Sequence, residues 1–150
     1  MVDRRAVLAV LLAAVLLAGC LGVGTPAYDD ATVTIRDAAT GEQLGTVAVR
    51  VADSPSERYT GLSETPRLAD GNGMLFVYPE AGDRTFVMRG MEYGLDIVFV
   101  GADGQITTIH GAPPPAETDG DRTYSGRARW VLEVPRGWTD ERGVDVGDDV

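Results

Sequence analysis

Short segments in which apolar and polar residues alternate are the feature that most constrains the fold of this chain. Val33 and Ile35 alternate with threonines, and valines occupy every second position of the range 47–51. A period of two places successive side chains on opposite faces of a β-strand. The segment 37–43, DAATGEQ, supplies turn residues between the two runs, so the pattern predicts a β-hairpin.

The same kind of pattern continues along the rest of the chain. Strands are predicted at 74–78, 85–89, 95–100, 105–109 and 127–134, with turns at 79–83 and 101–104 and room for one more strand in the tail 144–150. Short strands that are joined mostly by turns are typical of antiparallel architectures. The predicted fold is therefore mainly β and α+β at most, an antiparallel β-sandwich or a barrel-like domain.

One or two short helices complete the predicted fold. Ser54, Pro55 and Glu57 have the order of a helix start, because serine caps the first turn and proline suits the first helical position. The glutamate three residues after the cap can bond back to it. This helix is expected to end near Gly61, and a second short helix is expected over 137–142.

The charge balance excludes some partners. The chain has 150 residues and a net charge of -10, and all of its positive charges are arginines. It is one domain in length, and it lacks the excess positive charge that neutralises phosphates, so we expect no nucleic-acid partner. Fifteen aspartates against eight glutamates, without a single lysine, resemble the proteins of extreme halophiles. At molar salt, screening removes the repulsion between such carboxylates while their hydration keeps the surface soluble.

The first twenty residues are predicted to direct export. Arg4 and Arg5 precede an apolar run over 6–18, which is shorter than the ~20 residues that a membrane-spanning helix needs. The sequence Leu-Ala-Gly-Cys that ends at Cys20 resembles the lipobox of bacterial and archaeal lipoproteins, in which the cysteine carries the lipid and becomes the new N-terminus. We therefore expect a signal peptide over 1–19.

Cys20 is the only cysteine of the chain, so an internal disulfide is excluded and an anchoring role is favoured. The range 20–30 is then a lipid-anchored tether, and 31–150 a single domain on the extracytoplasmic face of the cell membrane. An uncleaved N-terminal anchor helix stays open as an alternative. Both the general and the twin-arginine export routes also stay open.

Several ordered blocks of the sequence resemble the domain of unknown function 192 family from about Val47 to Val150. The blocks are Arg58…Gly61-Leu62, Arg67-Leu68, Gly73-Met74-Leu75-Phe76-Val77, Phe86…Met88-Arg89, Leu95-Asp96-Ile97…Phe99-Val100, Asp103-Gly104…Ile106, Ala128…Val131-Leu132-Glu133-Val134 and Gly143…Val146-Gly147-Asp148. The resemblance implies a compact, mostly β domain of a kind that is often exported or membrane-tethered. It implies no particular reaction.

The segment FVMRGMEYGLDIVFV, residues 86–100, contains the first candidate site. Arg89 and Asp96 lie near the ends of two predicted strands that face a shared bend, so the two side chains could pair across it. Two interpretations of the pair stay open. Either an ion pair or strand-end hydrogen bonds of these residues fix the bend or, together with Arg58, they form a corner that binds an anion or another small ligand.

Methionines and the single histidine provide the second candidate. Met74, Met88, Met91 and His110 carry the thioether and imidazole groups that suit copper(I). Methionine in apolar strands is more often core filler, so no metal and no cofactor is predicted. Met88 and His110 are retained as candidate ligand-binding residues.

The motifs of common enzymes are missing from the sequence. It has no Gly-x-Ser-x-Gly elbow, no Gly-rich phosphate loop and no dinucleotide-binding fingerprint. The main prediction is a non-catalytic, lipid-anchored domain that binds a small ligand or a segment of another envelope protein. The alternative is an envelope-associated hydrolase that uses carboxylates or His110, and a third hypothesis is a structural component without a pocket.

Overall fold

A computed structural model describes residues 27–118 and 122–150. The predicted signal peptide, Cys20 and most of the predicted tether lie outside these ranges. None of the helices in the described ranges is long and apolar enough to cross a membrane.

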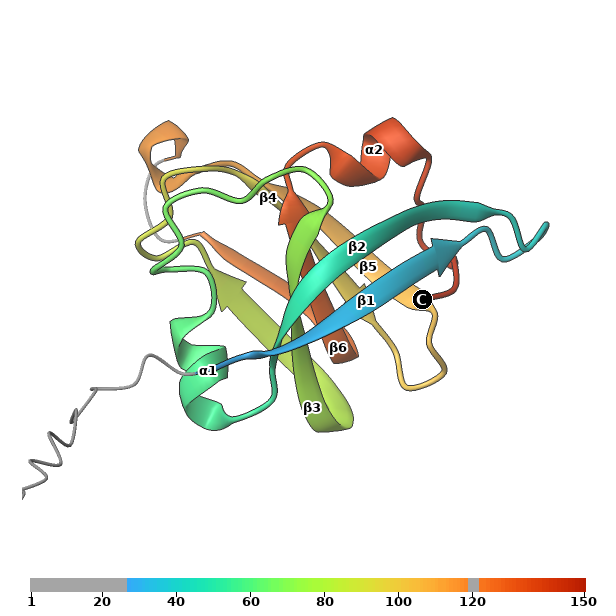
Figure 1. Ribbon diagram of the computed structural model, residues 1–150, viewed down its shortest axis with the longest axis horizontal. Coiled ribbons are helices and arrows are strands. Elements are labelled where there is room, and N and C mark those ends of the chain that lie inside the picture. The colour runs from blue at the N-terminus through green and yellow to red at the C-terminus, as the bar shows by residue number, and fades with distance from the viewer. Residues whose placement is uncertain (1–26, 119–121) are drawn as a thin grey trace, which may run out of the picture.

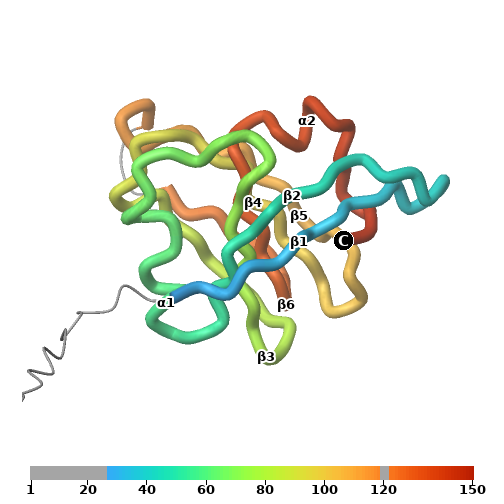
Figure 2. Tube along the Cα trace, in the orientation of Figure 1, coloured from blue at the N-terminus to red at the C-terminus, as the bar shows by residue number. Residues whose placement is uncertain are grey.

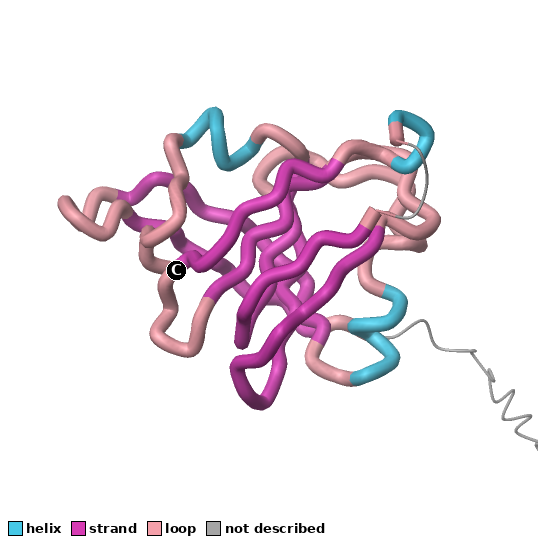
Figure 3. The backbone as a smooth tube through the Cα atoms, turned by 180° about the vertical axis from the view of Figure 1, so that it is seen from behind, coloured by secondary structure: helices cyan, strands magenta, loops and turns pink. Residues whose placement is uncertain are grey.

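Within the described residues, six strands form one sheet in the order β1-β2-β3-β6-β4-β5 (Figure 1). The strands are β1 (Asp29–Arg36), β2 (Gln43–Ala52), β3 (Asn72–Val87), β4 (Leu95–Val100), β5 (Ile106–Ala112) and β6 (Thr123–Pro135). The helices are α1 (Pro55–Thr60), α2 (Trp138–Arg142) and the single 3₁₀ turn η1 (Pro115–Glu117). Seen from behind, the helices lie at the periphery and the strands fill the centre (Figure 3).

The predicted fold class is confirmed, because the protein is mostly β with short helices. The hairpins β1–β2 and β4–β5 form as predicted. The sheet is not closed into a barrel, and one pair, β2–β3, is parallel instead of antiparallel. The connection 53–71 contains α1, and parallel neighbours require a crossover of about this length. The tail adds no strand, since Asp149 forms only isolated bridges to Arg36 and Gln105.

Strand β3 differs most from the prediction. We expected a turn over 79–83, but the pairing with β6 continues through it, with an irregularity between Val77 and Gly82. Val77 is opposite Trp130 and Gly82 is opposite Ala128, so four residues of β3 span one residue of β6. Both strands reverse direction at this point (Figure 2).

The reversal folds the sheet over onto one of its own faces. Phe86, in the returning half of β3, packs edge-on against Phe76 of the first half, with ring centroids 4.9 Å apart. It contacts Phe99 of β4 in the same way at 5.8 Å. One apolar cluster therefore fills the space inside the fold, and a second one, which includes Trp138 of α2, covers the other face.

Helix α1 begins as predicted. The Ser54 hydroxyl accepts a hydrogen bond from the Glu57 amide at 3.3 Å, and the Glu57 carboxylate accepts one from the Ser54 amide at 2.9 Å. This reciprocal pair is the capping box that the sequence indicates. The chain leaves the helix at Gly61, whose φ of 50° suits glycine. The helix end is thereby fixed beside β3.

Candidate functional site

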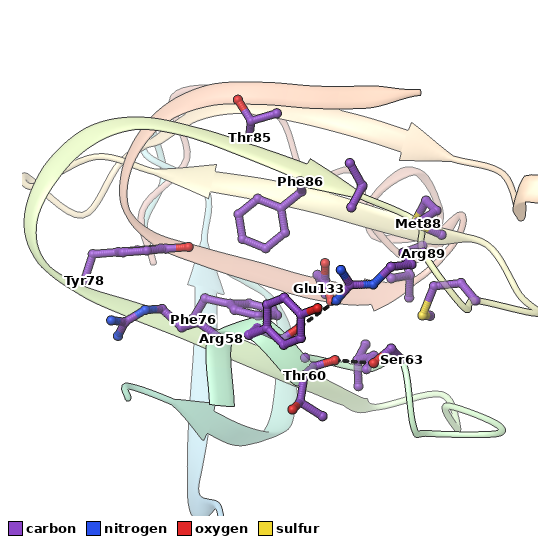
Figure 4. Close-up of a pocket in the computed structure, with 16 residues that line it drawn as sticks. Arg58, Thr60, Ser63, Phe76, Tyr78, Thr85, Phe86, Met88, Arg89 and Glu133 are labelled. Atoms are coloured by element: carbon purple, nitrogen blue, oxygen red, sulfur yellow. Dashed lines mark hydrogen bonds between the residues drawn. The ribbon is translucent and has the colours of Figure 1, made fainter. Parts of the chain in front are cut away.

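A pocket of about 210 Å³ lies between the end of α1, the returning half of β3 and the centre of β6 (Figure 4). Residues 58–63 form one side, and residues 85–89 of β3 and the bend after it form the other. Phe76 and Phe86 contribute aromatic walls, and Glu133 is the carboxyl group of the lining. The volume is below the roughly 300–1,000 Å³ of pockets for drug-sized ligands, so a bound molecule would be small.

Glu133 occupies the centre of the sheet. It lies opposite Met74 of β3 and Ile97 of β4, and it is only 5% exposed. In the described part of the chain, no hydrogen-bond donor reaches its carboxyl group. Burial therefore raises the pKa of Glu133 to about 8, because the charged form has lost its water without gaining a partner. The group is mostly protonated at pH 7.

Arg58 is held at the pocket by its surroundings. Its guanidinium donates hydrogen bonds to the backbone oxygens of Asp53 and Val77, the latter at 2.9 Å. It also lies over the ring of Tyr78, 5.0 Å from the centroid. These contacts orient a cation whose Nε and Nη2 donate to no other described residue.

Arg89 is held in a similar way across the pocket. Its Nη2 donates to the backbone oxygen of Tyr59 at 3.2 Å, and the guanidinium lies 4.4 Å from the centroid of the Tyr59 ring. Among the described residues, neither Arg58 nor Arg89 forms an ion pair with a carboxylate. Both side chains line the pocket, but the Arg58 guanidinium points towards Tyr78 and only that of Arg89 lies on the side of Glu133 (Figure 4).

Met88 is buried beside the same pocket. It is 6% exposed and belongs to the apolar cluster inside the fold. A second hollow, of about 480 Å³, shares Met88 and Arg89 with the first and extends towards Pro113 and Tyr124. The candidates Arg58, Arg89 and Met88 are therefore brought together by the structure.

The predicted pairing of Arg89 with Asp96 is wrong. The Asp96 carboxylate accepts hydrogen bonds from the Gly137 amide at 3.1 Å and from the Thr139 amide and hydroxyl at 3.0 and 2.7 Å. It therefore caps α2 from outside that helix, whose own N-cap is a glycine. The reason is the strand period, because the alternation that places Leu95 at the pocket places Asp96 on the other side of the sheet.

His110 lies away from the pocket. Its Nε2 is 2.9 Å from the backbone oxygen of Ser125, and since a carbonyl only accepts, this nitrogen carries the hydrogen. The ring is also packed edge-on against Phe99 and tilted against Tyr124. His110 thus links β5 to the first half of β6, and it is not among the residues that line the pocket around Glu133.

The copper(I) grouping is not assembled. Met74 is fully buried in the apolar cluster, while Met91 lines the pocket and His110 lies on β5 outside it. In the described ranges, no group of three or more His, Cys, Asp or Glu side chains is placed to hold a metal ion.

Glu133 is the site residue that the sequence analysis missed. The available indication was a single acid in the apolar run Trp130-Val131-Leu132-Glu133-Val134. On a strand with an apolar residue on both sides, such an acid lies either at an edge or inside the protein. Only the central position of β6 in the sheet shows that it lies inside.

Comparisons with known proteins agree on the family. The model of the domain of unknown function 192 family, described as uncharacterized ACR, matches residues 36–150. The fold is similar to the crystal structure of a protein from Sinorhizobium meliloti 1021 that is described as a proposed transcription regulator. The TM-score is 0.74 at 30% identity, over 84% of this chain and 95% of that one.

A protein of unknown function from Novosphingobium aromaticivorans is also similar. Its TM-score is 0.69 at 26% identity, over 85% of this chain and 92% of that one. A search of curated proteins finds no match. The chain belongs to the domain of unknown function 192 family.

Proposed function

We propose that this member of the domain of unknown function 192 family is a lipid-anchored domain that binds a small ligand outside the cytoplasmic membrane. The observation that carries the proposal is Glu133, a buried carboxyl group at an open pocket with no donor among the described residues. Such a group lowers the stability of the fold, and strongly perturbed carboxyl groups in clefts concentrate at functional sites.

Binding is favoured over hydrolysis by the composition of the pocket. Its lining contains one carboxyl group, whereas glycoside hydrolysis uses two that face each other. His110, the other predicted catalytic group, donates to a backbone oxygen outside the pocket. The small volume also favours a small molecule over a segment of another envelope protein as the ligand.

Anchoring through Cys20 is the second part of the proposal. It is supported by the lipobox-like sequence and by the position of β1, which begins only nine residues later at Asp29. Fractionation of cells that express the Cys20→Ser variant tests it. We expect the protein to leave the washed membrane fraction, and a variant that stays there would favour the uncleaved anchor helix.

The binding function is tested with full-length protein in detergent and a small-molecule extract of the cells that make it. We expect the extract to raise the thermal unfolding midpoint, because a ligand that binds only the folded state stabilises it. Ser63→Trp fills the pocket and should abolish the rise. Ser56→Trp is the matched control, since Ser56 is exposed on α1 and does not line the pocket. Equal responses from the two variants would contradict the proposed site.

A further inference from the structure

The charge of the pocket is opposite to that of the protein. The chain has a net charge of -10, whereas the charged groups of the lining are Arg58, Arg89 and Glu133. With Glu133 protonated, the lining carries two positive charges and no negative one. A positive cleft in an acidic protein concentrates anions locally and repels cations.

No other charged group of the described residues near Glu133 reverses this balance. The other titratable residues of the lining are Arg58 and Tyr59 of α1, Tyr78 of β3 and Arg89 of the loop that follows β3. Tyr93 of the same loop interacts electrostatically with Glu133. Burial raises the pKa of Tyr78 and of Tyr93, so both side chains stay neutral. Strand β4, which pairs with β6, contributes apolar side chains on this face.

We propose that the ligand is a small organic carboxylate, with its charged end at Arg89 and the Glu133 carboxyl group and its apolar body against the Phe76 and Phe86 rings. This inference rests on the proposed binding function and names the ligand class of the same pocket. A protonated carboxyl group donates a short, charge-assisted hydrogen bond to a carboxylate, and arginine donates to both carboxylate oxygens. At Arg89, the donors that the described residues leave free can form such bonds, since only its Nη2 donates, to the Tyr59 backbone oxygen.

A cationic ligand fits the site less well. Cations already lie over the two tyrosine rings that would attract an ammonium group, since Arg89 lies over Tyr59, and Arg58 and Arg84 lie over Tyr78. An ammonium ion would also require ionised Glu133 in an apolar environment. A phosphate dianion is disfavoured for a related reason, because the apolar walls would replace the water around its second charge.

Benzoate and benzylamine, which share a shape and carry opposite charges, are suitable probes for full-length protein in detergent. We expect benzoate to bind, and its apparent dissociation constant to be about tenfold larger at pH 9 than at pH 7. The binding-competent fraction, with Glu133 protonated, falls by about that factor across a pKa of about 8. Ser63→Trp should abolish the binding.

Two variants separate the roles of the charges. Glu133→Gln keeps a neutral hydrogen-bond donor at position 133, so this variant should bind benzoate equally at both pH values. Arg89→Gln should weaken binding at least about tenfold at both pH values. Its control is Arg127→Gln, a change of an exposed arginine that is paired with Asp83 away from the pocket, which should leave binding unchanged.

The outcomes also distinguish this inference from the proposed function. The proposal of a carboxylate ligand would be overturned if benzylamine or inorganic phosphate bound more tightly than benzoate. It would also be overturned if the binding of benzoate did not weaken at pH 9. If the cell extract occupies the pocket in a manner that Ser63→Trp blocks while benzoate does not bind, the ligand class is wrong and the binding function stands. If neither the extract nor any probe shifts the unfolding midpoint, both fail.

Discussion

Replacing Glu133 with glutamine should change how the stability of the protein depends on pH. The wild-type carboxyl group has an ordinary pKa of 4.5, which burial raises to about 8 in the folded state. Between these values the folded protein keeps a proton that the unfolded chain has released. The stabilisation from this proton is complete below about pH 4.5, and it is lost as the pH rises through 8.

The size of the effect follows from the same two values. A pKa that rises from 4.5 to about 8, at about 1.4 kcal/mol for each pH unit, corresponds to about 5 kcal/mol of unfolding free energy. That is a large share of the 5–15 kcal/mol that typically stabilises a domain. Glu133→Gln removes this titration while it keeps the size and polarity of the side chain. The variant should therefore be several kcal/mol more stable than the wild type above pH 8 and similar to it near pH 5.

Urea unfolding between pH 5 and pH 9 measures the difference. The fluorescence of Trp130 and Trp138 reports on β6 and α2 and so on the global transition. When the unfolding free energy of the variant is subtracted from that of the wild type at each pH, the contributions of the other acidic groups cancel. Glu117→Gln is the control, because Glu117 is exposed and forms an ion pair with exposed Arg136, so its curve should parallel the wild type. Parallel curves for Glu133→Gln would refute the reasoning, since they would show a carboxyl group that stays ionised in the folded protein.

Three further predictions concern the fold. Asp96→Ala should lower the unfolding free energy by about 3 kcal/mol or more, because it leaves buried donors of α2 unpaired, while Arg89→Leu should change it by less than about 0.5 kcal/mol. In urea unfolding, the change in unfolding free energy of the double variant should equal the sum of the two single changes. A non-additive result would support an ion pair between Arg89 and Asp96. Ser54→Ala should lower the unfolding free energy by about 1 kcal/mol, and an unchanged urea midpoint would contradict the capping role. The thermal midpoint should rise between low and molar sodium chloride, and equal midpoints would count against a halophilic protein.

Local patterns predicted the local parts of the fold. The hairpins β1–β2 and β4–β5 and the capped helix α1 each depend on residues close together in the sequence. The parallel pair β2–β3 and the reversal of β3 depend on which strands become neighbours, and alternation does not encode that. The same limit applied to the site, since Arg58 and Arg89 line one pocket whereas Asp96, which was grouped with them, bonds to α2 on the other side of the sheet. Its face depended on the register of β4 with strands far away in the sequence.

The reversal of β3 and β6 explains why the sheet tolerates a carboxyl group at its centre. The returning half of β3 covers the first half with Phe86, but the strand ends at Val87 and the chain turns at Gly90, whose φ is 71°. The cover therefore stops short, and the pocket opens beside Glu133. Val131, two positions earlier on the same face of β6, is fully buried in the apolar cluster. The buried carboxyl group of Glu133 thus lies where the cover by β3 ends, which is the arrangement expected when a residue serves binding at the expense of stability.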